Sequence, residues 1–75
     1  MGWTEVAARV AGEIAAGRWS EGESLPGVRR LAREAGCSPG TAARVYAALR
    51  DAGVLRGEPR SRFAVAHRGA ARAAG

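Results

Sequence analysis

The stretch Leu25–Gly53, LPGVRRLAREAGCSPGTAARVYAALRDAG, decides the fold of this chain. Early in the stretch, apolar residues follow the i, i+3, i+4, i+7 spacing of a helix with one buried face, at Val28, Leu31, Ala32 and Ala35. Gly36 is expected to end this helix, because glycine readily takes the left-handed conformation that closes helices. The pattern therefore predicts a short helix over residues 27–35, followed by a sharp turn.

The rest of the stretch predicts a second helix, over residues 38–52. Ser38 is suited to cap its amino end, and Pro39 to its first position, where a missing N–H costs nothing. On a helical wheel, Tyr46 lies at the margin of an inward face formed by Ala42, Val45, Leu49 and Ala52. The outward face is small and nearly uncharged, with Gly40, Ala43, Arg44 and Ala47. Such a face suits a helix that fits a groove, and the two helices have the layout of a helix-turn-helix.

Segments on both sides extend this pair of helices into a larger fold. Upstream, a helix capped by Thr4 is predicted over residues 4–16, because apolar residues recur every fourth position, at Val6, Val10 and Ile14. Downstream, apolar runs at 54–56 and 62–66 flank a loop with glycine and proline, which predicts a β-hairpin. We therefore expect a mainly α fold with a small β-hairpin, a winged helix-turn-helix of three helices plus a two-stranded wing.

The aromatic residues are expected to serve packing. Trp19 lies in the connection 18–26 and is expected to cover the core between helices, since buried aromatic side chains contribute much of the packing energy. Trp3 is interpreted as a packing anchor at the first helix, and Tyr46 as a packing residue rather than one that stacks on bases. The length of 75 residues predicts one domain, at 1–66, with a flexible C-terminal tail at 67–75.

The charge balance points to a polyanionic partner. All twelve basic residues are arginine, and the net charge is +5 in a chain of 75 residues. Arginine suits phosphate and guanine, although the absence of lysine also fits the coding habit of a GC-rich bacterium. No apolar run approaches the roughly 18 residues needed to span a bilayer, and no signal-peptide pattern opens the chain. We expect a cytoplasmic bacterial protein, associated with the nucleoid and not with a membrane.

Little in the chain is equipped for catalysis. There is one cysteine and one histidine, with no conspicuous carboxylate pair and no phosphate-binding glycine loop. Cys37 cannot form an internal disulfide, and no ligand cluster suggests zinc. The sequence thus predicts a protein that is not an enzyme and uses neither a metal nor another cofactor.

Three motifs, each at the expected distance from the next, resemble the DNA-binding domain of the GntR family of bacterial transcription regulators. The family pattern Ile-x-x-Gly, an apolar residue and Gly-x-x-Leu-Pro is matched by residues 14–26. Its second-helix pattern, Leu-Pro-Ser-x-Arg-x-Leu-Ala, is matched by residues 25–32, with Gly27 in place of serine. Its recognition-helix pattern is matched by residues 37–49, where Pro39 and Tyr46 lean toward the YtrA and MocR branches.

The resemblance implies sequence-specific binding to double-stranded DNA, most often for repression, by a homodimer on an inverted-repeat operator. Helix 38–52 would read the major groove, and the basic wing at 56–62 would contact the backbone or minor groove. Arg44, the next outward residue of that helix, is the leading candidate for reading guanine through O6 and N7. Ala43 occupies a position that is often arginine in other branches, so that contact is missing here. The implied DNA-binding residues are Arg29, Arg30, Ser38, Pro39, Gly40, Thr41, Arg44, Arg60 and Arg62.

Other interpretations stay open. Arg29, Arg30 and Arg33 also fit a solvated helix face, with Arg30 and Arg33 as auxiliary phosphate contacts, and Thr41 also fits a hydrogen bond within its own helical turn. The wing replaces the family's usual Gly-x-Gly with Arg60 and Arg62, so it would insert a side chain or bind phosphate. The chain could also be a protein-interaction module, or a fragment of a larger regulator with a separate effector-binding domain. No effector ligand is expected for this chain alone.

Overall fold

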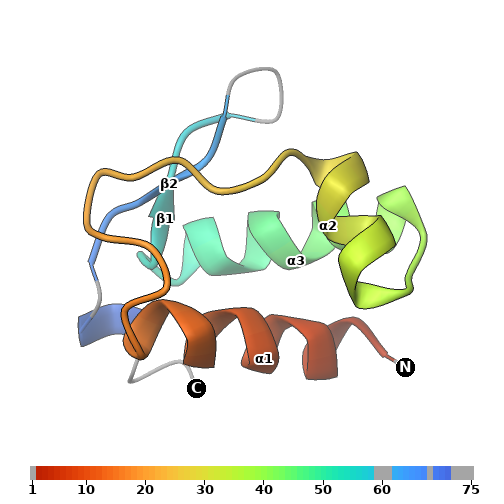
Figure 1. The fold of residues 1–75 in the computed structure, drawn as a ribbon, viewed down its shortest axis with the longest axis horizontal. Helices are drawn as coiled ribbons and strands as arrows, with labels where there is room; N and C mark the ends of the chain where they lie inside the picture. The colour runs from red at the N-terminus through yellow and green to blue at the C-terminus, as the bar shows by residue number, and fades with distance from the viewer. Residues whose placement is uncertain (1, 59–61, 68, 72–75) are drawn as a thin grey trace.

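The computed structural model describes residues 2–58, 62–67 and 69–71 of the chain. Three helices come first, α1 (Trp3–Ala15), α2 (Val28–Ala35) and α3 (Pro39–Asp51), followed by the short strands β1 (Leu55–Arg56) and β2 (Ala64–Val65) (Figure 1). This order confirms the predicted mainly α fold with a small hairpin. Helix α1 packs against α3, and the hairpin follows the carboxyl end of α3 and extends away from α1 (Figure 1).

The core lies where the apolar stripes of the three helices meet. Helix α1 contributes Val6, Val10, Ala11 and Ile14, and α3 contributes Ala42, Val45, Tyr46 and Leu49. Helix α2 adds Leu31 and Ala32, and the connection before it adds Trp19 and Leu25. Trp19 is buried, as its expected packing role requires. Because each stripe follows the helical period, the positions of the predicted core residues are largely confirmed.

The hairpin is tied to the connection between α1 and α2. Strands β1 and β2 are antiparallel, with Leu55 opposite Val65. Ser24 forms an isolated bridge with Ala64, and backbone hydrogen bonds link the 22–25 segment to residues 63–65 at 2.8 to 3.0 Å. The segment treated as a plain connection in the sequence therefore acts as a third, irregular strand beside β2. Strand β2, at the base of the wing, therefore forms main-chain hydrogen bonds with β1 on one side and with residues 22–25 on the other.

Glycine is required at two turns. Gly36 ends α2 with a φ of 69°, the left-handed conformation predicted for it. Gly57 follows β1 with a φ of 124°, and a Cβ atom there would lie 2.6 Å from the Arg62 carbonyl oxygen. The two sides of the wing can approach closely only because residue 57 has no side chain.

Three details of the helix predictions were wrong. Helix α1 begins at Trp3, one residue before Thr4, and its N-cap is Gly2, which makes no side-chain capping bond. The side chain of Trp3, the first residue of the helix, packs against the core. Ala52 was placed inward, but it is exposed because α3 ends at Asp51 and the chain turns away. Tyr46, placed at the margin, is instead one of the largest fully buried side chains.

The C-terminal segment also differs from the tail expected for it. Residues 69–71 form a helical turn, and the side chain of Ala71 is fully buried. The segment before this turn is bonded to the residue that precedes β1. The Ala66 and His67 N–H groups both donate to the Val54 carbonyl oxygen, at 2.8 and 3.4 Å. Alanine is small enough to pack flush without an apolar period, which explains why the sequence pattern gave no signal.

Candidate nucleic-acid interface

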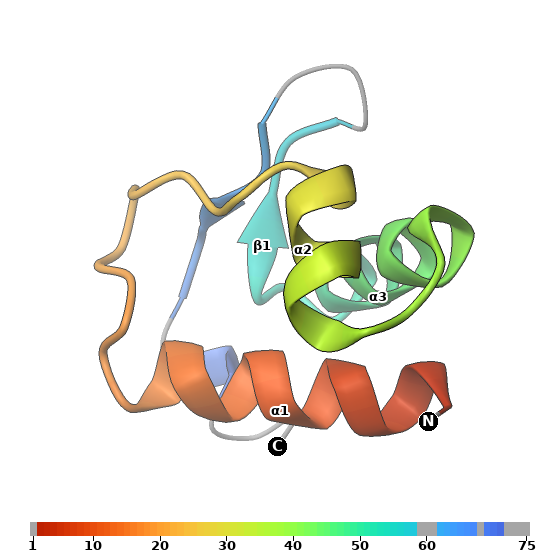
Figure 2. The ribbon, with the colours of Figure 1, turned by 45° about the vertical axis from the view of Figure 1, so that its right-hand side comes forward.

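The turn between α2 and α3 holds the amino end of α3 by a side-chain cap. The Ser38 Oγ accepts a hydrogen bond from the Thr41 N–H at 3.1 Å. The Ser38 hydroxyl in turn donates a hydrogen bond to the Thr41 Oγ1 at 3.0 Å. Pro39 occupies the first position of the helix, as predicted. The Thr41 hydroxyl is thus engaged within its own turn. Ser38, Pro39 and Gly40 are all exposed at the amino end of α3. Figure 2 shows the turn that leads from α2 into this end of α3.

No packing contact within the protein requires glycine at position 40, at the tip of α3. A Cβ atom at this position would have only the Ser38 Oγ within 4 Å, at 3.9 Å, and the backbone has an ordinary negative φ. A side chain at position 40 would therefore be accommodated by the protein itself. A helix tip this bare permits another molecule to approach the backbone closely.

Arg44 is exposed on the same face as Gly40, one turn further along α3. Its guanidinium carbon lies 4.5 Å from the centroid of the Trp3 ring, so the side chain reaches across to the start of α1. Within the described part of the chain, no carboxylate forms an ion pair with it. Arg44 is thus positioned at the surface with its charge uncompensated.

The three arginines of α2 are not equivalent. Arg30 forms an ion pair with Glu34 one turn along, with Nε 3.1 Å from Oε2. Arg29 and Arg33 are exposed, and neither forms an ion pair among the described residues. They line an open hollow of about 440 Å³ at the helix-turn-helix junction, together with Ala32, Cys37 and Pro39. Two unpaired cations beside the tip of α3 are suited to attract an anion.

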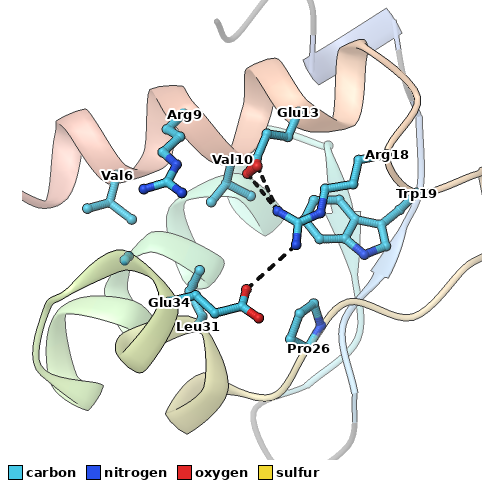
Figure 3. Close-up of a pocket in the computed structure, with 10 residues that line it drawn as sticks. Val6, Arg9, Val10, Glu13, Arg18, Trp19, Pro26, Leu31 and Glu34 are labelled. Carbon is cyan, nitrogen blue, oxygen red and sulfur yellow. Dashed lines mark hydrogen bonds and ion pairs between the residues drawn. The ribbon is translucent and has the colours of Figure 1, made fainter.

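Arg18 fastens the helix-turn-helix to α1, a role that the sequence analysis missed. Its guanidinium stacks on Trp19 at 4.4 Å and forms ion pairs with Glu13 of α1 at 2.7 Å and Glu34 of α2 at 3.7 Å (Figure 3). The adjoining enclosed cavity measures about 20 Å³, too small for an organic ligand. The cluster is structural, and only the Glu13–Arg18 spacing, just over one helical turn, would have signalled it.

Tyr46 connects α3 to the entrance of α2. Its hydroxyl donates a hydrogen bond to the Pro26 carbonyl at 2.6 Å, and its ring lies 5.2 Å from that of Phe63 in the hairpin. Burial raises the pKa of Tyr46 to about 12, with a further contribution from the Glu34 carboxylate. The interpretation of Tyr46 as a packing residue agrees with these contacts.

The structure describes two of the three arginines that were predicted to make the wing basic. Arg56 and Arg62 are both exposed, while Arg60 lies outside the described residues. At its base, Arg50 of α3 approaches Glu58 at 3.7 Å, which joins the end of the helix to the hairpin. Among the described residues, the wing therefore carries two exposed arginines, Arg56 and Arg62.

The structure brings together most of the predicted DNA-binding residues, since Ser38, Pro39, Gly40, Thr41 and Arg44 share the tip and outer face of α3. Arg29 lies beside them on α2. Arg33 joins Arg29 at the hollow, whereas Arg30 is engaged with Glu34. The described residues contain no group of three potential metal ligands, and no helix among them is long and apolar enough to cross a membrane.

Comparison with solved structures finds similar folds over nearly the whole chain. Streptococcus agalactiae BusR, in complex with its busAB-promoter DNA, is 27% identical with a TM-score of 0.87, covering 95% of this chain and 35% of BusR. YtrA from Sulfolobus acidocaldarius, a GntR-family transcription factor, is 27% identical with a TM-score of 0.74, covering 96% and 64%. A transcriptional regulator from Oenococcus oeni is 25% identical with a TM-score of 0.78, covering 95% and 60%. No curated protein sequence gave a match.

The chain therefore spans about a third of BusR and just under two thirds of YtrA. The likeness to YtrA is consistent with the branch indicated by Pro39 and Tyr46. The family model described as bacterial regulatory proteins of the GntR family matches residues 3–65. With a winged helix-turn-helix over these same residues, the chain belongs to the GntR family of bacterial DNA-binding transcription regulators.

Proposed function

We propose that this chain binds double-stranded DNA sequence-specifically and regulates transcription. In this proposal it acts as a repressor that occupies an operator overlapping a promoter. The observation that carries the proposal is the bare, exposed tip of α3, beside Arg29, Arg33 and Arg44, which form no ion pair with any residue that the structure describes. An α-helix fits the B-DNA major groove, and cations on either side would lie close to the phosphates. The BusR structure, which contains its own promoter DNA, supports this use of the fold.

In this proposal some side chains hold the protein on the DNA backbone and others read the base sequence. Arg29 and Arg33 contact backbone phosphate, while Arg30 shares its charge with Glu34 and contributes less. Ser38, Pro39, Gly40 and Thr41 bring the main chain of the α3 tip to the groove, and Arg44 reads guanine through O6 and N7. The wing, through Arg56, Arg60 and Arg62, contacts the backbone or the minor groove.

The proposed operator is an inverted repeat bound by two copies of the protein in the bacterial cytoplasm. A single module of this size buries only about 600–1,000 Å² on DNA, so one half-site should bind with modest affinity. That affinity should also fall steeply with salt, because phosphate contacts release counterions. Because the chain spans only part of BusR and YtrA, an effector-binding domain elsewhere in a longer protein also remains within the proposal.

The test is selection of duplexes from a random pool by the purified chain, followed by binding measurements at several salt concentrations. An enriched sequence that binds more tightly than its scrambled counterpart supports the proposal. Absence of measurable duplex binding at about 50 mM salt, where electrostatic contacts are strong, would favour a protein-interaction module instead.

A further inference from the structure

Trp3 and Arg44 form a contact that the DNA-binding proposal does not by itself explain. The Arg44 guanidinium carbon lies 4.5 Å from the centroid of the indole, although Trp3 is the first residue of α1 and Arg44 lies within α3, far along the sequence. We propose that Trp3 is a positioning residue for DNA recognition, whose ring holds the Arg44 guanidinium with its N–H edge presented to DNA bases. This inference rests on the proposed function.

Trp3 is suited to hold another side chain because it is itself held. It is the first residue of α1, it is half-buried, and its ring packs against the hydrophobic core. Helices α1 and α3 also pack against each other. The indole therefore stays in one place relative to α3, and Arg44 meets a fixed surface.

The kind of contact matters for what Arg44 can still do. A guanidinium group has five N–H donors, all of which lie at the edge of its plane. A carboxylate partner occupies this edge, whereas an aromatic ring occupies only the face of the plane. Arg44 stacks on Trp3 and has no carboxylate partner among the described residues. Its donors remain available for guanine O6 and N7, which accept from the edge.

The second arginine–tryptophan pair in the chain makes the contrast clear. Arg18 stacks on Trp19 at nearly the same distance, 4.4 Å, but its edge is occupied by Glu13 and Glu34. Trp19 is also fully within the core, while Arg44 and Trp3 meet at the surface. One pair is completed by two carboxylates and is structural, and the other is left open toward solvent on the face of α3 that carries Gly40.

Holding Arg44 in advance lowers the entropy lost when it binds a base, because a long side chain is already restricted. An exposed cation–π contact is worth enough to change affinity by about two- to fivefold. We therefore expect Trp3→Leu to weaken binding to the selected duplex by about that factor, with little change for a scrambled duplex. Trp3→Tyr, which keeps an aromatic face, should recover most of the loss.

The experiment is a double-mutant cycle of Trp3→Leu and Arg44→Ala, measured by fluorescence anisotropy on a duplex selected by the native chain and on its scrambled counterpart. If Trp3 acts through Arg44, Trp3→Leu changes nothing further once Arg44 is alanine. Side-chain NMR of the free protein gives a readout without DNA, because the indole ring current shifts the Arg44 δ protons and Trp3→Leu should remove that shift. Thermal melts establish that each variant is folded.

Arg18→Ala is the matched control, since it removes the cation from the other tryptophan and should leave the preference for the selected duplex unchanged in the folded protein. Additive losses from Trp3→Leu and Arg44→Ala, or an unshifted Arg44 side chain in the native protein, would overturn the inference while leaving the proposed function intact. A native chain that binds no duplex would overturn the proposed function, and the inference with it.

Discussion

The Tyr46 hydroxyl donates a 2.6 Å hydrogen bond to the carbonyl oxygen of Pro26, which joins the middle of α3 to the residue just before the N-cap of α2. Helix α2 is therefore linked to α3 near both of its own ends, by the turn at Gly36 and by this bond. Because the relative placement of α2 and α3 decides which side chains reach one groove of DNA together, this bond bears on function as well as on stability.

Tyr46→Phe removes the hydroxyl but keeps the ring that packs against Phe63. We expect the free energy of unfolding to fall by about 1 kcal/mol, the usual net worth of one hydrogen bond. Chemical denaturation of the two proteins measures the difference. An equal stability of the variant would show that the bond to Pro26 does not contribute to the fold.

The same tyrosine predicts how stability changes in alkaline solution. Its pKa is about 12 in the folded protein and about 10 in an unfolded chain, so folding favours the neutral phenol. The stabilisation is fully present below about pH 10 and is lost as the pH rises through 10 to 12. A two-unit difference corresponds to about 2–3 kcal/mol.

Absorbance at 295 nm, where tyrosinate absorbs, can follow this titration because the chain has a single tyrosine. We expect tyrosinate to form near pH 12 in the native protein and near pH 10 in denaturant. The fall in stability over this range should be absent from Tyr46→Phe. A native titration near pH 10 would contradict the burial of the hydroxyl.

Gly40→Ala should separate stability from binding. Alanine is favoured over glycine in helices by up to about 1 kcal/mol, and a Cβ at position 40 has open space, so the variant should be slightly more stable. It should bind the selected duplex more weakly if the α3 tip meets DNA closely. Gly12→Ala is the matched control, because Gly12 is exposed on α1 and a Cβ there contacts nothing within 4 Å. Equal affinities of the two variants would argue against close approach at Gly40.

Arg33→Ala and Arg30→Ala test the difference between a free and a paired arginine. Loss of a phosphate contact should weaken binding to selected and scrambled duplexes alike and reduce the magnitude of the salt slope by about 1. We expect this from Arg33→Ala, while Arg30→Ala, whose side chain is paired with Glu34, should have a smaller effect. Affinity measured between about 50 and 200 mM salt gives both slopes. A larger loss from Arg30→Ala would reverse the assignment.

Much of the fold was predictable because its signals are local. The helical period around Leu31 and Val45, the cap at Ser38 and the glycine at position 36 each specify their own neighbourhood, and the structure agrees with them. The cluster around Arg18 was not predictable, since it joins residues of three segments whose relative placement appears only after folding. The burial of Ala71 was missed for a similar reason, because nothing in its own stretch marks it as apolar surface.

The candidate site was predictable to the level of the helix but not of the individual contact. The family motif indicated the tip of α3 and Arg44, yet the stacking of Arg44 on Trp3 depends on how α1 packs against α3. The pairing of Arg30 with Glu34, by contrast, follows the i,i+4 spacing of the sequence, whereas the place of Arg29 and Arg33 beside the turn appears only in the fold.

The central claim is that the exposed face of α3 reads DNA sequence through Arg44, and the most direct test is the ratio of affinities for the selected and scrambled duplexes in the native chain and in Arg44→Ala. Loss of one bidentate contact to guanine should cost about 1–3 kcal/mol on the selected duplex. On the scrambled duplex the loss should be much smaller, so the ratio should collapse toward one. An unchanged ratio in a folded Arg44→Ala protein would contradict the account.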